Sequence, residues 1–170
     1  ISTGMIDSPA STVDDIIAQR PDRISVFNYA HLPDLFKTQR QIDGGALPPP
    51  AEKLEILKTV IERMTEAGYV YIGMDHFAKP DDELAQAQQV GTLYRNFQGY
   101  STHPNCDLIG LGATSNGMVG DSYSQNLKTL EEYYARIDEG WLAVFRGVRL
   151  DADDRLRRAV ITDLICHFHL

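Results

Sequence analysis

The stretch that decides the fold is YVYIGMDHFAKPDDELAQAQQVGTLYRNFQGY, which runs from Tyr69 to Tyr100. Its first residues, up to Met74, are β-branched and aromatic, and they predict a strand that ends at Asp75 and His76. Pro80 and the acidic residues after it favour a helix start, because proline fits the first turn and carboxylates face the positive end of the helix dipole. The stretch then closes in a polar and aromatic loop.

A second strand and a helix precede this stretch. The segment Arg23–Tyr29 (RISVFNY) has the composition of a buried strand. Apolar residues at three- and four-residue steps from Leu54 to Met64 indicate a helix, and Gly68 suits the left-handed position after its end. Strand, helix and strand in this order predict a parallel βαβ unit, so we expect the α/β fold class.

The other expected elements lie on both sides. A helix over Ser11–Arg20 starts the chain, with Ser11 or Thr12 as its N-cap. Downstream we expect a strand at Asp107–Ala113, a helix with an apolar face from Leu127 to Ile137, a strand at Trp141–Val148 and a last helix capped by Asp151. The apolar residues of that last helix are predicted to be buried, and they are Leu156, Val160, Leu164 and Phe168.

Charge and composition exclude several classes of protein. The chain has 170 residues, of which 43% are hydrophobic, and this is ordinary for one globular domain. A net charge of -8 disfavours a nucleic-acid surface, which needs clustered basic residues. Arg155, Arg157 and Arg158 do cluster, and we interpret them as the polar face of the last helix. The alternative is a non-enzymatic binding module that inserts this helix into a nucleic acid.

The expected location is the cytoplasm. No apolar run approaches the ~20 residues that span a bilayer, and the segment from Ile1 to Ala10 lacks the pattern of a signal peptide. Cys106 and Cys166 are 60 positions apart and form no zinc-finger or CxxC motif. We therefore expect a soluble protein in a reducing compartment, without membrane or nucleic-acid partners.

Three residues at predicted strand ends are candidates for a metal site. His31 follows the first strand, and Asp75 and His76 follow the second. Ligands gather at the carboxyl ends of parallel strands, so a small metal-dependent hydrolase that uses His31, Asp75 and His76 is one hypothesis. The spacing matches no HxH or HExxH motif, and histidines with a structural hydrogen bond are the alternative.

Four runs of the sequence are similar to a known family. The runs are RPDRISVFNYAHLP (Arg20 to Pro33), GYVYIGMDHFAKPDDELAQAQ (Gly68 to Gln88), RNFQGYST (Arg95 to Thr102) and DLIGLGATSNGMVGDSYSQN (Asp107 to Asn126). In order and spacing they resemble the oxygen-independent coproporphyrinogen III oxidases, which are radical S-adenosylmethionine enzymes of haem biosynthesis. The resemblance covers nearly the whole chain from about Thr12 onward.

The resemblance implies a reaction and its cofactors. Such an enzyme oxidatively decarboxylates two propionates of coproporphyrinogen III to vinyl groups and yields protoporphyrinogen IX. A [4Fe-4S] cluster cleaves S-adenosylmethionine, and the radical that results takes a hydrogen from the propionate β-carbon. The fold must hold cofactor and substrate in line and exclude water from the radical.

Three residues are assigned roles through this resemblance, and a fourth through its charge. Ala30 matches a position that contacts a second S-adenosylmethionine, and Gln98 matches a polar residue that lines that region. Asn116 matches a position against the cluster-bound S-adenosylmethionine, where the family usually has an aliphatic residue. Arg95 is assigned to a substrate carboxylate from its charge. From the residues alone, the loop that contains Arg95 and Gln98 fits either a pocket for a flat anion or a surface turn.

The chain differs from the family by an absence. Family members bind the cluster through a CxxxCxxC motif, and the sequence has none, so the cluster ligands are not in this chain. We expect residues 1–140 to be the later part of a partial (β/α) TIM-like barrel with parallel strands, and residues 141–170 to begin a mainly helical C-terminal domain. The expected partner is the remaining N-terminal part of a monomeric parent enzyme, and the chain alone is expected to be inactive.

Overall fold

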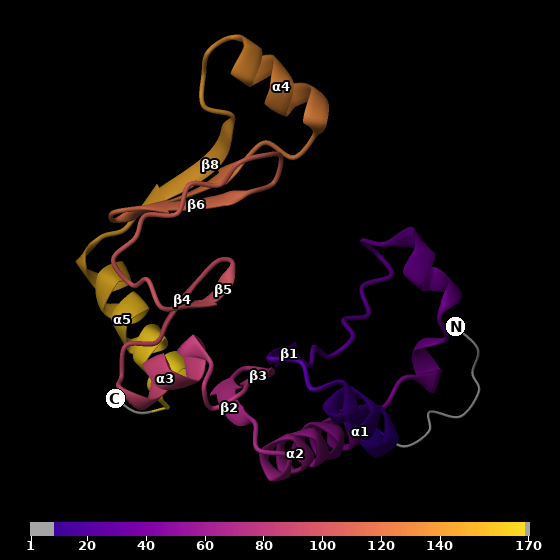
Figure 1. Cartoon of the computed structure of the whole chain (residues 1–170). Helices are drawn as coiled ribbons and strands as arrows, with labels where there is room; N and C mark the ends of the chain where they lie inside the picture. Colours follow the sequence, from indigo (N-terminus) through magenta and orange to yellow (C-terminus); the bar gives the residue numbers. More distant parts are fainter. Residues whose placement is uncertain (1–8, 169–170) are drawn as a thin grey trace. The chain divides into compact units, whose positions relative to one another are not determined.

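The computed structural model describes residues 9–168, and Figure 1 labels the helices and strands. The chain divides into two compact units with a boundary between Gln86 and Ala87. The N-cap predicted at Ser11 or Thr12 is wrong, because both residues lie within helix α1 (Pro9–Gln19). Among the described residues, no helix combines the length and the apolar character that a membrane crossing needs.

The described part of the first unit packs two helices against a small sheet. Its strands are β1 (Arg23–Ser25), β2 (Val70–Gly73) and β3 (His76–Ala78), its long helix is α2 (Pro50–Glu66), and two short 3-10 turns, Lys37–Gln41 and Gly44–Ala46, connect β1 to α2. The predicted end of α2 is confirmed. Gly68 has a φ of 88°, and its N–H donates to the carbonyl of Thr65 while that of Tyr69 donates to Met64. These are the two bonds of a Schellman motif.

The core of this unit lies between the helices and the sheet. Val13 from α1 and Val60 and Met64 from α2 are buried together with Tyr69 and Phe77. The Tyr69 hydroxyl donates to the carbonyl of Pro21 at 2.7 Å, which satisfies the one polar atom that this ring brings inside. The helical spacing that predicted α2 therefore also identified the face that it buries.

The predicted parallel βαβ pairing is wrong. Strand β3 lies between β1 and β2 and pairs with both of them in antiparallel register. The cause is a two-residue reversal at Met74 and Asp75, whose φ angles of 46° and 98° turn the chain back directly after β2. Positive φ at both loop residues matches the twist of a tight hairpin. Strands β1 and β2 still run in the same direction, because both are antiparallel to β3.

The first predicted strand is shorter and more exposed than expected. Strand β1 covers three residues of the seven predicted at Arg23–Tyr29. Phe27 and Tyr29 are 71% and 44% exposed, so the second half of this segment is not a buried strand. Strand β1 is an edge strand, and Ile24 and Val26 are the residues of the predicted segment that pack against the core cluster.

The second unit contains a hairpin, a three-stranded sheet and two helices after the end of α3 (Glu83–Gln89), which spans the boundary (Figure 1). Strands β4 (Tyr94–Asn96) and β5 (Gly99–Ser101) form the hairpin. Strands β6 (Asn116–Val119), β7 (Ser122–Asn126) and β8 (Val144–Arg149) form an antiparallel sheet in that order. Helix α4 (Leu130–Asp138) connects β7 to β8, and α5 (Ala152–His167) follows β8.

The segment predicted as a strand at Asp107–Ala113 is not one. It forms a single isolated bridge, between Leu108 and Met118. A side chain at Gly110 would lie 2.5 Å from the carbonyl oxygen of Asn116, so the glycine allows this segment to cross β6 at close range. The helix expected from Leu127 and the strand expected from Trp141 are confirmed in kind, with the bounds of α4 and β8 given above.

The cap of α5 is confirmed, but its predicted buried face is wrong. The Asp151 side chain accepts the N–H of Asp154, and the Asp154 side chain accepts the N–H of Asp151, which completes a capping box. Leu156, Leu164 and Phe168 are 63%, 45% and 55% exposed, and Val160 is half-buried. Periodicity identified a helix with an apolar stripe, but Cys166 is the residue of α5 that is buried, because the hairpin and β6 pack on a different face.

Replacing Phe77 with alanine should destabilise the first unit by about 3 to 5 kcal/mol, because the ring is 1% exposed and its removal leaves a cavity. Phe27→Ala is the matched control, since that ring is 71% exposed and its loss should cost well under half as much. Urea unfolding monitored by circular dichroism measures both. Equal midpoints for the two variants would contradict the described core.

Candidate functional site

The β4–β5 hairpin presents Phe97 and Gln98 at its tip. The Gln98 N–H donates to the Asn96 side-chain oxygen at 2.8 Å, and Gly99 follows with a φ of 135°. An asparagine that accepts a bond from the second residue after it forms a turn on its own, and glycine adopts the positive φ without strain. The short range of these contacts fixes the path of the tip. The Gln98 side chain is exposed, and Phe97 is 50% exposed.

Helix α5 holds this hairpin through its last turn. The Tyr100 hydroxyl donates to the carbonyl of Ile165 at 2.9 Å, which is one of the terminal carbonyls that lack a partner within a helix. The Arg95 guanidinium lies over the Tyr100 ring, 4.7 Å from its centroid. A cation at the C-terminal end of a helix is favourable, because the helix dipole is negative there. Tyr100 therefore fastens the hairpin to α5, and Arg95 packs on the Tyr100 ring.

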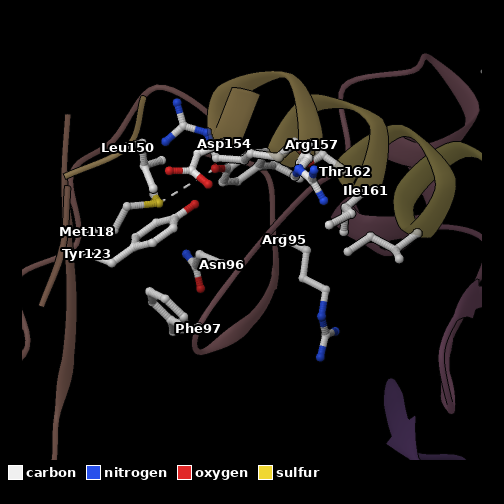
Figure 2. A pocket seen from close by; sticks show the side chains of 13 residues that line it. Arg95, Asn96, Phe97, Met118, Tyr123, Leu150, Asp154, Arg157, Ile161 and Thr162 are labelled. Carbon is white, nitrogen blue, oxygen red and sulfur yellow. Dashed lines mark hydrogen bonds between the residues drawn. The ribbon is translucent and has the colours of Figure 1, made fainter. Parts of the chain in front are cut away.

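Arg95 also lines a cavity of about 330 Å³. Figure 2 shows the cavity, with the Arg95 guanidinium directed away from Asp154 and Arg157 of α5. Its Nη1 atom is buried and has no hydrogen-bond acceptor among the described residues. A buried donor without an acceptor costs free energy, so this atom is a candidate for binding an anionic group. The cavity is lined by Tyr94, Arg95, Asn96, Phe97, Met118, Tyr123, Leu150, Asp154, Arg157, Arg158, Ile161, Thr162 and Ile165.

A second groove opens over one face of the β6–β7–β8 sheet. It has a volume of about 360 Å³ and contains Asn116. The Phe97 ring meets the Tyr123 ring edge-on, with centroids 5.1 Å apart, so the hairpin tip forms one wall. The lining residues are Phe97, Asn116, Tyr123, Ser124, Gln125, Arg146, Gly147 and Val148. Aromatic rings beside amide and guanidinium groups form a setting in which a planar polar molecule can be held.

The arginines of α5 bind acidic side chains of the chain itself. Arg155 and Arg158 each contact Asp121 at 3.0 Å, and Arg157 contacts Asp153 at 2.7 Å. The hydrogen bonds from Arg155 and then Arg158 hold the pKa of Asp121 below its usual value. The interpretation of these arginines as a polar helix face is correct for Arg157, while the other two attach α5 to the turn between β6 and β7.

The three residues assigned through the family resemblance, and Arg95 assigned from its charge, lie in different surroundings. Gln98, Asn116 and Arg95 belong to the second unit, with Asn116 in the sheet groove and Arg95 at the cavity. Ala30 belongs to the first unit, is exposed, and its carbonyl accepts a bond from Gln39 Nε2 at 3.2 Å. Their roles stay predictions.

The three candidate ligands of a metal site lie in the first unit. His31 Nδ1 lies 3.2 Å from the Tyr29 hydroxyl, His76 packs edge-on against Phe27, and Asp75 forms the hairpin turn. Over residues 9–168, no group of three or more His, Cys, Asp or Glu side chains could hold a metal ion. The structure therefore does not bring His31, Asp75 and His76 together as ligands.

Sequence reasoning missed three residues of the sheet groove. Tyr123, Gln125 and Arg146 were not singled out, although Tyr123 and Gln125 alternate with serines in the β7 sequence SYSQN. That alternation is the signal of a two-faced strand and could have placed them on one side. Arg146 could not have been found in this way, because its neighbours depend on the register between β7 and β8.

The arrangement of the described chain matches a solved radical enzyme. The structure of coproporphyrinogen III oxidase from Escherichia coli, described there as a radical SAM enzyme, superposes with a TM-score of 0.91 and 52% sequence identity. The match covers 96% of this chain and 38% of that one. No family model matches the sequence. The chain is thus an α/β relative of one segment of a radical SAM enzyme.

Curated relatives of this chain carry the name of one particular enzyme. Oxygen-independent coproporphyrinogen III oxidase from Pseudomonas aeruginosa is 58% identical over 164 residues, and that from Escherichia coli is 52% identical over the same length. Each match covers 96% of this chain but 36% of the relative, so the chain spans about a third of the length of these proteins. The resemblance of this chain to the oxygen-independent coproporphyrinogen III oxidases is therefore confirmed.

The two thiols should differ in reactivity. Burial raises the pKa of the Cys166 thiol to about 11, while Arg95 lowers it in part, and Cys106 is exposed. At pH 8 roughly one Cys166 in a thousand would then be a thiolate, the reactive form. Titration with a chromogenic disulfide should detect one fast thiol in the native chain and two after unfolding.

Two variants assign the fast thiol. Cys106→Ser should abolish the fast phase, and Cys166→Ser should leave it unchanged. Fast reaction of native Cys106→Ser would show that α5 does not bury Cys166.

Proposed function

We propose that this chain is a segment of an oxygen-independent coproporphyrinogen III oxidase, and that the whole protein oxidatively decarboxylates coproporphyrinogen III to protoporphyrinogen IX. The observation that carries the proposal is the 58% identity over 96% of the chain, together with a TM-score of 0.91 to a solved radical SAM enzyme. Identity at this level extends over both units rather than a single motif, which supports a shared role.

The cofactors of the whole protein are proposed to be S-adenosylmethionine and a [4Fe-4S] cluster. When bound, they supply the radical that removes hydrogen from the propionate. The chain has two cysteines, so the three thiolates of a cluster motif are proposed to come from the N-terminal part of the whole protein. The donor set of the sheet groove fits a nucleoside, because the Asn116 amide lies beside the Phe97 and Tyr123 rings.

The residues of this chain are proposed to bind and orient the ligands. Ala30 and Gln98 are assigned to a second S-adenosylmethionine and Asn116 to the cluster-bound one, on the strength of the family resemblance. Arg95 is assigned to a substrate carboxylate, and its buried Nη1 atom without an acceptor supports that assignment.

The architecture of the whole protein is proposed along the same lines. Residues 1–140 would contribute the later part of a partial barrel with parallel strands, and residues 141–170 would begin the helical C-terminal domain. The shared direction of β1 and β2 supports the barrel assignment, although both pair with β3 in this chain. A monomeric state and a cytoplasmic location complete the proposal.

The protein encoded by the whole reading frame should form product from coproporphyrinogen III when S-adenosylmethionine and a reductant are supplied. The 170-residue chain should give none, because it contains no cluster motif. Product is measured under anaerobic conditions, as porphyrin fluorescence after oxidation and separation. We expect the codons upstream of Ile1 to encode an in-frame CxxxCxxC motif. Turnover by the 170-residue chain, or an upstream frame without that motif, would overturn the proposal.

Arg95→Ala in the whole enzyme should raise KM or lower kcat, with a combined loss of about tenfold or more in kcat/KM, because a charge-assisted carboxylate contact is removed. Arg136→Ala is the matched control, since that arginine is 52% exposed on α4 and pairs with Glu139. Arg95→Lys keeps the charge and should recover part of the loss. Kinetics of Arg95→Ala that equal those of the control would remove Arg95 from substrate binding.

A further inference from the structure

A row of three polar side chains crosses the β6–β7–β8 sheet. Asn116 on β6 lies opposite Gln125 on β7, and Gln125 lies opposite Arg146 on β8. Residues directly opposite on neighbouring strands share a face, so the three side chains span about 10 Å across the sheet. All three line the sheet groove.

An apolar row lies beside the polar one. Tyr123 is opposite both Met118 and Val148, two residues along each strand from the polar row and therefore on the same face. Tyr123 and Val148 line the groove, and the Phe97 ring closes it against Tyr123. The groove thus offers a flat apolar surface next to a line of hydrogen-bonding groups.

The chain fixes the orientation of the Arg146 guanidinium. Arg146 Nε donates to Gln125 Oε1 at 3.0 Å, and Gln125 Nε2 donates to the carbonyl of Thr114 at 3.5 Å. The bond at Nε leaves both Nη groups available, and they form the fork that fits a carboxylate with two parallel bonds. Gln125 therefore acts as a positioning residue for Arg146.

Arg146 differs from the helix arginines of the second unit in its charge balance. Arg136, Arg155, Arg157 and Arg158 each contact an acidic side chain. Among the described residues, no carboxylate pairs with Arg146, and its Nε donates to a neutral amide. A charged fork held by an amide, beside an aromatic wall, is suited to an acid from outside the chain.

We propose that this groove binds a carboxylate of a ring-bearing ligand, with the Arg146 fork on the carboxylate and the ring against Phe97 and Tyr123. The choice of ligands rests on the proposed function, which supplies two sources of this chemistry. One is a propionate of the tetrapyrrole substrate, and the other is the carboxylate of S-adenosylmethionine.

Titrations of the 170-residue chain can test the groove with paired probes. The first pair is coproporphyrin III and its tetramethyl ester, and the second is S-adenosylmethionine and its decarboxylated form. In each pair the ring is kept and the carboxylate is masked or removed. Porphyrin fluorescence and calorimetry measure the dissociation constants, and circular dichroism verifies that each variant is folded.

Two variants and two matched controls test the carboxylate contact. Arg146→Gln removes the fork and should weaken binding of the carboxylate probe about tenfold, whereas Arg149→Gln, on the opposite face of β8, should change it less than about twofold. Gln125→Glu places a competing acid on Arg146 Nε and should cause a similar loss. Ser122→Glu adds the same charge on the opposite face of β7 and is its control.

The outcomes distinguish the two sources of the carboxylate, and they distinguish this inference from the proposed function. A loss confined to coproporphyrin III supports the groove with propionate as its ligand, and a loss confined to S-adenosylmethionine supports it with the amino-acid carboxylate. Three outcomes would overturn the inference. One is that Arg146→Gln and Arg149→Gln weaken binding equally, and another is that Arg146→Gln weakens the masked probes as much as the free acids. The third is that a folded chain binds neither acid. Turnover by the whole enzyme is a separate readout, so its absence would count against the proposed function and not against the groove.

Discussion

The candidate site depends on one contact, the hydrogen bond from the Tyr100 hydroxyl to the carbonyl of Ile165. Helix α5 ends with carbonyls that have no partner in the helix, and Tyr100 supplies a donor to one of them from the hairpin. The same ring carries the Arg95 guanidinium. Because Tyr100 is two residues from Gln98 on the hairpin, anchoring this ring also limits where the tip can go. The Phe97 wall of the sheet groove depends on that anchor.

Much of the fold follows from local sequence. The C-terminal end of α2 and the N-terminal end of α5 are predictable. Gly68 in a Schellman motif and Asp151 in a capping box act through bonds within a few residues. Strand β2 is predictable from its β-branched and aromatic composition. The hairpin tip is also local, because Asn96 binds the backbone of Gln98 directly. In these elements the sequence contains both partners of the deciding interaction.

The errors arise where the deciding partner is distant or atypical. Met74 and Asp75 make a tight reversal without the Asn-Gly signal of such turns, so a hairpin was mistaken for the end of a parallel strand. On α5 the apolar stripe is real, but which face packs is set by the hairpin and by Asp121, more than thirty residues away. The sheet groove also depends on residues that are distant in the sequence. Gln125 and Arg146 meet through a register that α4 interrupts in the sequence.

The two candidate arginines of the second unit are stabilised in different ways, and this bears on what each can bind. Arg95 lies over the Tyr100 ring and close enough to the end of α5 to act on Cys166, and both the ring and the negative end of the helix dipole favour a cation. An anion that binds it must therefore compete with contacts that already favour the cation. Arg146 is held by a neutral amide at one nitrogen, so its charge is not offset by any described acid. Binding a carboxylate at the exposed Arg146 fork costs less desolvation than binding it at the buried Nη1 of Arg95. The lower dielectric at Nη1 makes that contact stronger once it forms. The exposed fork is thus suited to recognising an acid, and the buried one to orienting it.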